Sequence, residues 1–111
     1  MKAILKMPHK RPEIVEVENS LEALQEIVGG NIQEYPFYVD ASVLCNEAGL
    51  SLPGDQYNTK IGRLHFFGPV LIVGTAEECY TDVPQPETTM ELLWPTAEHK
   101  KRPVFRTKTG Q

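Results

Sequence analysis

The sequence predicts an α+β domain: a mainly antiparallel sheet of about five strands with one helix packed on one face, followed by an extended basic C-terminal tail. Short apolar runs separated by turn residues recur through the first two thirds of the chain, and this pattern is typical of strands joined as hairpins. Only residues 20–28 combine helical spacing of apolar residues with clear end signals, so one helix is expected.

The first two runs predict a hairpin. Residues 2–7 (KAILKM) are mostly apolar, and Pro8 and Pro12 in the polar stretch that follows end this strand. Residues 13–18 (EIVEVE) alternate valine with glutamate. That alternation has the period of two expected of a half-buried strand.

The helix has signals at both ends. Asn19 or Ser20 can cap its first free N–H groups, and Glu22 stands three residues after Asn19, where a capping-box acid would stand. Gly29-Gly30 ends the helix, because glycine adopts the left-handed conformation at low cost. The apolar residues at helical spacing are Leu21, Leu24, Ile27 and Val28.

The middle of the chain reads as further strands. Residues 31–39 form one strand with Pro36 at an edge or bulge, residues 42–45 form a short one, and residues 50–59 are loop-like. Residues 62–74 form one or two strands with a break or bulge at Gly68-Pro69.

The stretch FGPVLIVGT at residues 67–75 also has to be weighed as a phosphate loop. Such a loop has four residues between its glycines and then a lysine, whereas Gly68 and Gly74 are separated by five and no lysine follows. Pro69 removes a backbone donor that the loop would need. The run Val-Leu-Ile-Val instead indicates a strand that is buried on both faces.

We expect residues 1–80 to form the α+β domain and residues 81–111 an irregular extension with a basic tail. Pro84 and Pro86 indicate extended chain, and residues 90–94 (MELLW) indicate a single helical turn that ends at Pro95.

Charge is distributed unevenly, although the net charge is only −4. All 15 acidic residues lie at or before Glu98, and residues 12–59 contain no lysine or arginine. After Glu98 the chain contains lysine and arginine but no aspartate or glutamate, and these basic residues include Lys100, Lys101, Arg102 and Arg106. An acidic body repels nucleic acid, so we interpret these residues as an interaction tail or as an internal partner of the acidic surface.

Several functional classes find little support. No apolar run has the length of a membrane span, and the N-terminus lacks the features of a secretory signal, so a cytoplasmic location is expected. Cys45 and Cys79 are expected to be reduced and at least half-buried, with no metal site or cofactor. A Cys45–His65 nucleophile pair stays open but resembles no known motif, so we expect a protein that is not an enzyme.

The chain resembles the domain of unknown function 3846 family, small proteins of bacterial phages and mobile elements. The resemblance covers residues 1 to about 80. It is carried by residues 1–5 with Pro8, the helix at residues 19–30, residues 45–49 (CNEAG), Leu52-Pro53 followed by Asn58, and residues 68–74 (GPVLIVG). It implies an accessory protein that acts by binding, countering host defence being a common role, and it implies no catalytic residues.

The leading hypothesis is therefore a non-enzymatic accessory protein that binds and inhibits a host protein or protein–nucleic acid complex, for example in CRISPR or restriction defence. Its acidic surface would cover a basic groove on the partner. The residues expected to make this contact are Glu16, Glu18, Asp40, Glu47 and Asp55.

The alternative is a module that sequesters a small signalling nucleotide, acting as a homo-oligomer. Residues 55–60 (DQYNTK) and Arg63 would bind the nucleotide. Tyr57 would stack on the base, Asn58 would supply hydrogen bonds, and Lys60 and Arg63 would bind phosphate.

Overall fold

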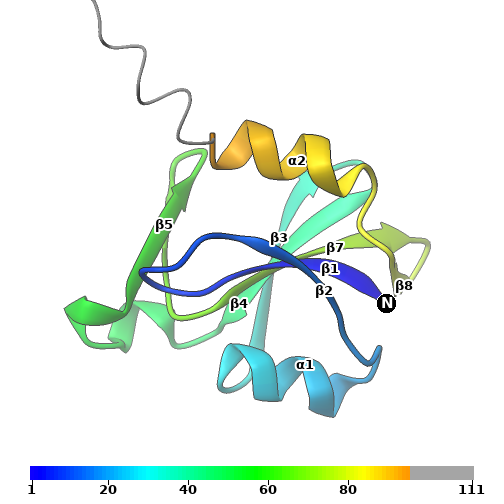
Figure 1. The fold of residues 1–111 in the computed structure, drawn as a ribbon. Helices are drawn as coiled ribbons and strands as arrows, with labels where there is room; N and C mark the ends of the chain where they lie inside the picture. The colour runs from blue at the N-terminus through cyan, green and yellow to red at the C-terminus, as the bar shows by residue number, and fades with distance from the viewer. Residues whose placement is uncertain (96–111) are drawn as a thin grey trace, which may run out of the picture.

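A six-stranded sheet forms the body of the computed structural model, which describes residues 1–95 (Figure 1). The strand order is β2-β1-β7-β4-β3, with β8 also paired to β7, and a separate hairpin, β5-β6, lies beside the sheet. All of these pairings are antiparallel, as predicted. The strands are β1 (Lys2–Lys6), β2 (Glu13–Glu16), β3 (Ile32–Tyr38), β4 (Ala41–Asn46), β5 (Tyr57–Ile61), β6 (Leu64–Phe67), β7 (Val70–Ala76) and β8 (Cys79–Thr81).

Strand β7 is the central strand, and it contains the Val-Leu-Ile-Val run. On one side β4 pairs with residues 71–74, and on the other side β1 and β8 share its length, β1 along residues 70–72 and β8 along residues 74–76. Residues 70–74 are all buried. The prediction of a strand buried on both faces is thus confirmed, and Gly68 (φ 79°) and Pro69 lie in the link between β6 and β7.

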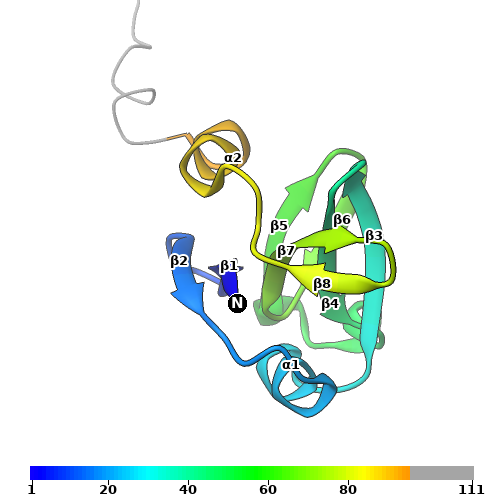
Figure 2. The same ribbon diagram turned by 90° about the vertical axis from the view of Figure 1, so that its right-hand side faces the viewer.

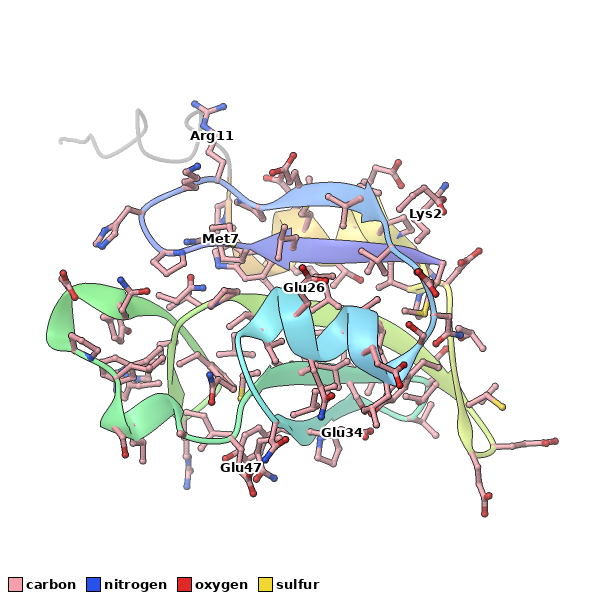
Figure 3. All side chains as sticks on the ribbon, turned by 90° about the horizontal axis from the view of Figure 1, so that it is seen from below. Lys2, Met7, Arg11, Glu26, Glu34 and Glu47 are labelled. Atoms are coloured by element: carbon pink, nitrogen blue, oxygen red, sulfur yellow. The ribbon has the colours of Figure 1, made fainter. Side chains whose placement is uncertain are left out.

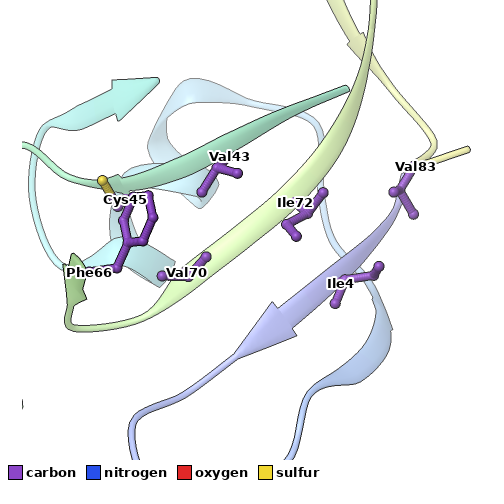
Figure 4. Close-up of a cluster of buried hydrophobic side chains, with 7 residues drawn as sticks. All are labelled: Ile4, Val43, Cys45, Phe66, Val70, Ile72 and Val83. Carbon is purple, nitrogen blue, oxygen red and sulfur yellow. The ribbon is translucent and has the colours of Figure 1, made fainter. Parts of the chain in front are cut away.

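Alternate residues of the sheet point into two hydrophobic clusters, one on each face. One cluster contains Ile4, Val43 and Ile72 (Figure 4), and the other contains Ala3, Leu44 and Leu71. Helix α1 (Leu21–Val28) covers the second face, and helix α2 (Pro86–Leu93) together with the hairpin β5-β6 covers the first. Figure 2 shows the two helices on opposite sides of the sheet, so the prediction of a single helix on one face was wrong.

Helix α1 was predicted closely. Ser20 is its N-cap, because the Ser20 Oγ accepts a hydrogen bond from the Ala23 N–H at 3.2 Å, and Gly29 ends it in the left-handed conformation. The capping-box interpretation of Glu22 fails, since with Ser20 as N-cap the third helical position belongs to Ala23.

The hairpin β5-β6 corrects the prediction that residues 50–59 are loop throughout. Short 3₁₀ turns occupy Gly49–Ser51 and Gly54–Gln56, but Tyr57 begins a strand. A register shift between Tyr57 and Thr59 leaves Asn58 as a bulge, and this breaks the alternation that marks a strand in sequence.

Residues 81–95 correct the expected irregular extension. Val83 is only 3% exposed and belongs to the core, and Met90, Leu93 and Trp94 pack on the same cluster. Pro86 occupies the first turn of α2, where its missing N–H costs no helical hydrogen bond. The ordered body therefore extends beyond residue 80, through the end of α2.

Candidate functional site

A groove of about 310 Å³ lies between the hairpin and one end of the main sheet. Residues 45–51, which run from the end of β4 into the first 3₁₀ turn, form one wall, and residues 63–67 form the other. Gln33 and Tyr35 of β3 complete the lining. We call this site the β4–β6 groove. It arises because Phe66 packs with Val43 and Cys45 in the core and contacts the Tyr35 ring edge-on, with 5.7 Å between ring centroids.

The wall formed by residues 63–67 is a strand edge. Five consecutive residues line the groove, although neighbouring side chains of a strand point to opposite faces. Within the described residues 1–95, strand β6 pairs only with β5, so its other edge carries no strand from this part of the chain. The groove therefore runs along the unpaired backbone edge of β6.

The lips of the groove combine apolar side chains with two opposite charges. Leu50 is 85% exposed on one lip, and Leu64 is 43% exposed on the other. Glu47 lies on the first side and Arg63 on the second, and neither side chain forms a hydrogen bond or ion pair within residues 1–95. Both charges are therefore available to a ligand.

Cys45 and His65 line the same groove but do not form a nucleophile pair. The Cys45 Sγ donates to the Gln33 carbonyl at 3.7 Å, whereas the His65 Nδ1 lies 3.0 Å from the Tyr57 hydroxyl. Burial raises the pKa of the Cys45 thiol, which opposes formation of the reactive thiolate. The expectation that both cysteines are at least half-buried holds for Cys45 only, because Cys79 is exposed.

The residues proposed for nucleotide binding divide between several roles. Arg63 lines the groove, while Tyr57 packs its ring against His65 and Phe67, at 5.7 and 5.3 Å between centroids. Lys60 lies opposite His65 in the hairpin and is exposed.

Asn58 has a structural role instead. Its Nδ2 donates to the carbonyls of Lys6 at 2.6 Å and Gly68 at 2.7 Å, and its Oδ1 accepts from the Lys6 Nζ at 2.9 Å. The amide of Asn58 is thus fully engaged within the protein.

The predicted acidic contact residues lie at two opposite ends of the sheet. Figure 3 labels Lys2 and Met7 at the two ends of β1. The register places Glu16 and Asp40 at the Lys2 end, together with Glu18, which follows β2. At the opposite end lie Glu47, labelled in Figure 3, and Asp55, whose carbonyl contacts the His9 Nε2 at 2.7 Å.

Other sequence expectations concern metals, the tail and membranes. Within residues 1–95 no three His, Cys, Asp or Glu side chains gather in a way that would hold a metal ion. Neither α1 nor α2 has the length and apolarity of a membrane-spanning helix. The basic residues Lys100, Lys101, Arg102 and Arg106 lie outside the described residues.

Sequence reasoning missed Gln33, Leu50 and Leu64 as site residues. Leu50 lies in a polar loop where an isolated leucine carries no periodic signal, and the groove exists only because β6 is brought beside the end of β4.

Comparison with known proteins identifies a family. No curated protein matches the chain, and no solved structure matches it either. The family model described as "Domain of unknown function (DUF3846)" matches residues 1–93, which extends the predicted resemblance through helix α2. The chain therefore belongs to the DUF3846 family.

Proposed function

We propose that the protein is a non-enzymatic binding protein that captures a segment of a partner protein in the β4–β6 groove and thereby inhibits the partner. One observation carries the proposal: the groove joins an unpaired strand edge to exposed leucines and unpaired charges. Exposed apolar side chains that cluster around a cavity are typical of interaction sites.

The physical role of each part follows from its position. Leu50 and Leu64 would lose their contact with water when a partner covers the lips, and this burial supplies the main driving force. Arg63 and Glu47 would orient the partner, because the opposite charges lie on opposite walls and do not pair with each other.

The partner class rests on the family resemblance. We propose a bacterial phage or mobile-element protein that works in the host cytoplasm and inhibits a host macromolecule, with counter-defence as its role. The acidic residues Glu16, Glu18 and Asp40 share one end of the sheet. In this proposal they contribute a second, longer-range attraction to a basic partner.

The test compares three baits in a quantitative pull-down from host lysate. A Leu50→Ser/Leu64→Ser variant removes the apolar lips, and a Glu16→Gln/Glu18→Gln variant removes acidic charge at the far end of the sheet. We expect wild type to retain a specific protein that the leucine variant loses and the glutamine variant keeps at physiological salt. Equal capture by all three baits would overturn the groove as the binding site.

A second candidate function, sequestration of a small nucleotide by an oligomer of the chain, is favoured by Arg63. This free cation lies on a groove that also exposes aromatic side chains and whose volume is near the lower end of the range for small-ligand sites. The groove would then bind the phosphate through Arg63, and the base would pack against Phe67 or Tyr35.

A thermal-shift measurement against a nucleotide panel tests this candidate. Binding to the native state raises the melting temperature by mass action. We expect a rise with one nucleotide that is absent from Arg63→Gln if the candidate is correct. An unchanged melting temperature across the panel would contradict it and leave the protein-binding proposal.

A further inference from the structure

We infer that the groove binds its partner by strand addition, with an extended peptide pairing to the backbone of His65 and placing a carboxylate on Arg63. The inference rests on the proposed function and specifies the partner of that site. It follows from the direction of the His65 backbone, the identity of its neighbours and the unpaired charge of Arg63.

Two observations fix the direction of the His65 backbone. Gly62 (φ 62°) and Arg63 form a two-residue turn, so Ile61 and Leu64 exchange the hydrogen bonds next to it and the N–H and C=O of His65 point away from β5. A Cβ built on Gly49 would lie 3.5 Å from the Phe67 carbonyl oxygen, so this carbonyl faces the opposite wall. Residues two apart in a strand point their carbonyls in the same direction, and the carbonyl of His65 therefore faces the groove as well.

The backbone groups of His65 are free to pair. Neither its N–H nor its C=O bonds to a side chain, or to backbone outside the β5-β6 ladder, within residues 1–95. Strand β3 is an edge strand of the main sheet, and it contains Pro36, a residue that commonly guards an edge against unwanted pairing. Strand β6 has no such guard on the residues that face the groove.

The neighbours of His65 define the peptide. A peptide residue that exchanges both hydrogen bonds with His65 in antiparallel pairing places its two neighbours opposite Leu64 and Phe66. Those two side chains share the hairpin face that packs toward the sheet, so the neighbours should be apolar. The peptide residue two positions after the one that pairs with His65 lies opposite Arg63. A carboxylate at that position would pair with the free guanidinium.

Three capped pentapeptides test the inference by NMR titration of the ¹⁵N-labelled full chain. The first is acetyl-Thr-Val-Thr-Leu-Asp-amide. The second carries a methyl group on the central threonine nitrogen, which removes one backbone hydrogen bond, and the third replaces aspartate with lysine. Each peptide is added to wild type and to Arg63→Gln, whose substitution lies in an exposed turn.

We expect the first peptide, at millimolar concentration, to shift the amide signals of His65 and of the residues around it. The methylated and lysine peptides should bind roughly tenfold more weakly, as the loss of one backbone bond or one charge-assisted bond implies. Arg63→Gln should abolish the difference between aspartate and lysine but keep that between methylated and unmethylated peptide.

Each other outcome has a defined meaning. Equal binding of the methylated peptide would overturn strand addition and leave the groove as a binding site. No shift at His65 with any peptide would overturn the inference, while the leucine variant in the pull-down would still decide the proposed function. Shifts around the groove with a nucleotide alone would overturn both the inference and the protein-binding proposal.

Discussion

Asn58 and Lys6 hold each other through two reciprocal hydrogen bonds: the Lys6 Nζ donates to the Asn58 Oδ1 at 2.9 Å, and the Asn58 Nδ2 donates to the Lys6 carbonyl at 2.6 Å. Lys6 is only 8% exposed and forms no ion pair within residues 1–95. A third bond, from the Asn58 Nδ2 to the Gly68 carbonyl, ties the bulge of β5 to the link before β7. This joint fixes the hairpin, and hence one wall of the groove, to the main sheet.

Asn58→Ala should lower the free energy of unfolding by about 3 kcal/mol, because it removes three partly buried hydrogen bonds worth roughly 1 kcal/mol each. Urea unfolding measures the loss. Asn31→Ala is the matched control, since its side chain accepts one exposed bond from Gln25 at 3.3 Å and should cost under about 0.5 kcal/mol. Equal losses in the two variants would show that the joint does not fix the hairpin.

Lys6 should make stability depend on pH in an identifiable direction. Burial lowers the pKa of its amine below 10.5, so as pH rises the native state releases this proton before the unfolded state does. Between the lowered pKa and 10.5 the unfolded chain binds more protons, and native stability therefore increases with pH. The stability of wild type minus that of Lys6→Met should rise through this range and level off above it. A difference that falls with pH would contradict the assignment.

The prediction from sequence succeeded where local pattern and tertiary environment agree. The Val-Leu-Ile-Val run became β7 because a central strand needs apolar residues on both faces, and Ser20 and Gly29 set the ends of α1 through local caps. Strand β5 was missed because the bulge at Asn58 interrupts the alternation of polar and apolar residues. The hydrogen bond that holds Asn58 to Lys6 also spans 52 residues, so no local pattern indicates it.

The groove was beyond prediction for a related reason. Its walls come from segments that do not pair with each other, and a contact of this kind depends on how the hairpin packs over the sheet. Arg63 was proposed from sequence as a phosphate-binding residue, but Leu50 and Gln33, which line the same groove, have no periodic or motif signal that would link them to it.

Tyr80 should ionise only at high pH, because its side chain is partly buried and its hydroxyl donates to the Glu34 carboxylate at 2.8 Å. Burial, this hydrogen bond and the negative charge of Glu34 together raise the pKa of Tyr80 to about 12. A folded-state pKa above the usual 10.0 means that the stabilisation is complete below pH 10 and is lost as pH rises through about 12.

The phenolate absorbance of wild type minus that of Tyr80→Phe should therefore show one transition with a midpoint of about 12. At neutral pH Tyr80→Phe should cost about 1 kcal/mol, the usual value for one such bond. Glu34→Gln should move the transition to lower pH, since it removes the negative charge. A midpoint that stays in place in Glu34→Gln would show that the negative charge of Glu34 does not contribute to the raised pKa of Tyr80.

Gly74 should tolerate no side chain, because a Cβ there would collide with the Asp82 carbonyl oxygen. The close approach lets Lys2 and residues 82–83 pair: the Lys2 N–H donates to the Asp82 Oδ1 at 2.7 Å, and the Val83 N–H donates to the Lys2 carbonyl at 2.8 Å. Gly74→Ala must push this segment away from β7 and withdraw Val83 from the core, so we expect a loss of about 3 kcal/mol in urea unfolding.

Hydrogen exchange at the Lys2 and Val83 amides should accelerate more in Gly74→Ala than exchange in α1. A Cβ at Gly54 would meet no atom of residues 1–95 within 4 Å, so Gly54→Ala should change stability by less than about 0.5 kcal/mol. A similar loss in both variants would contradict the steric explanation.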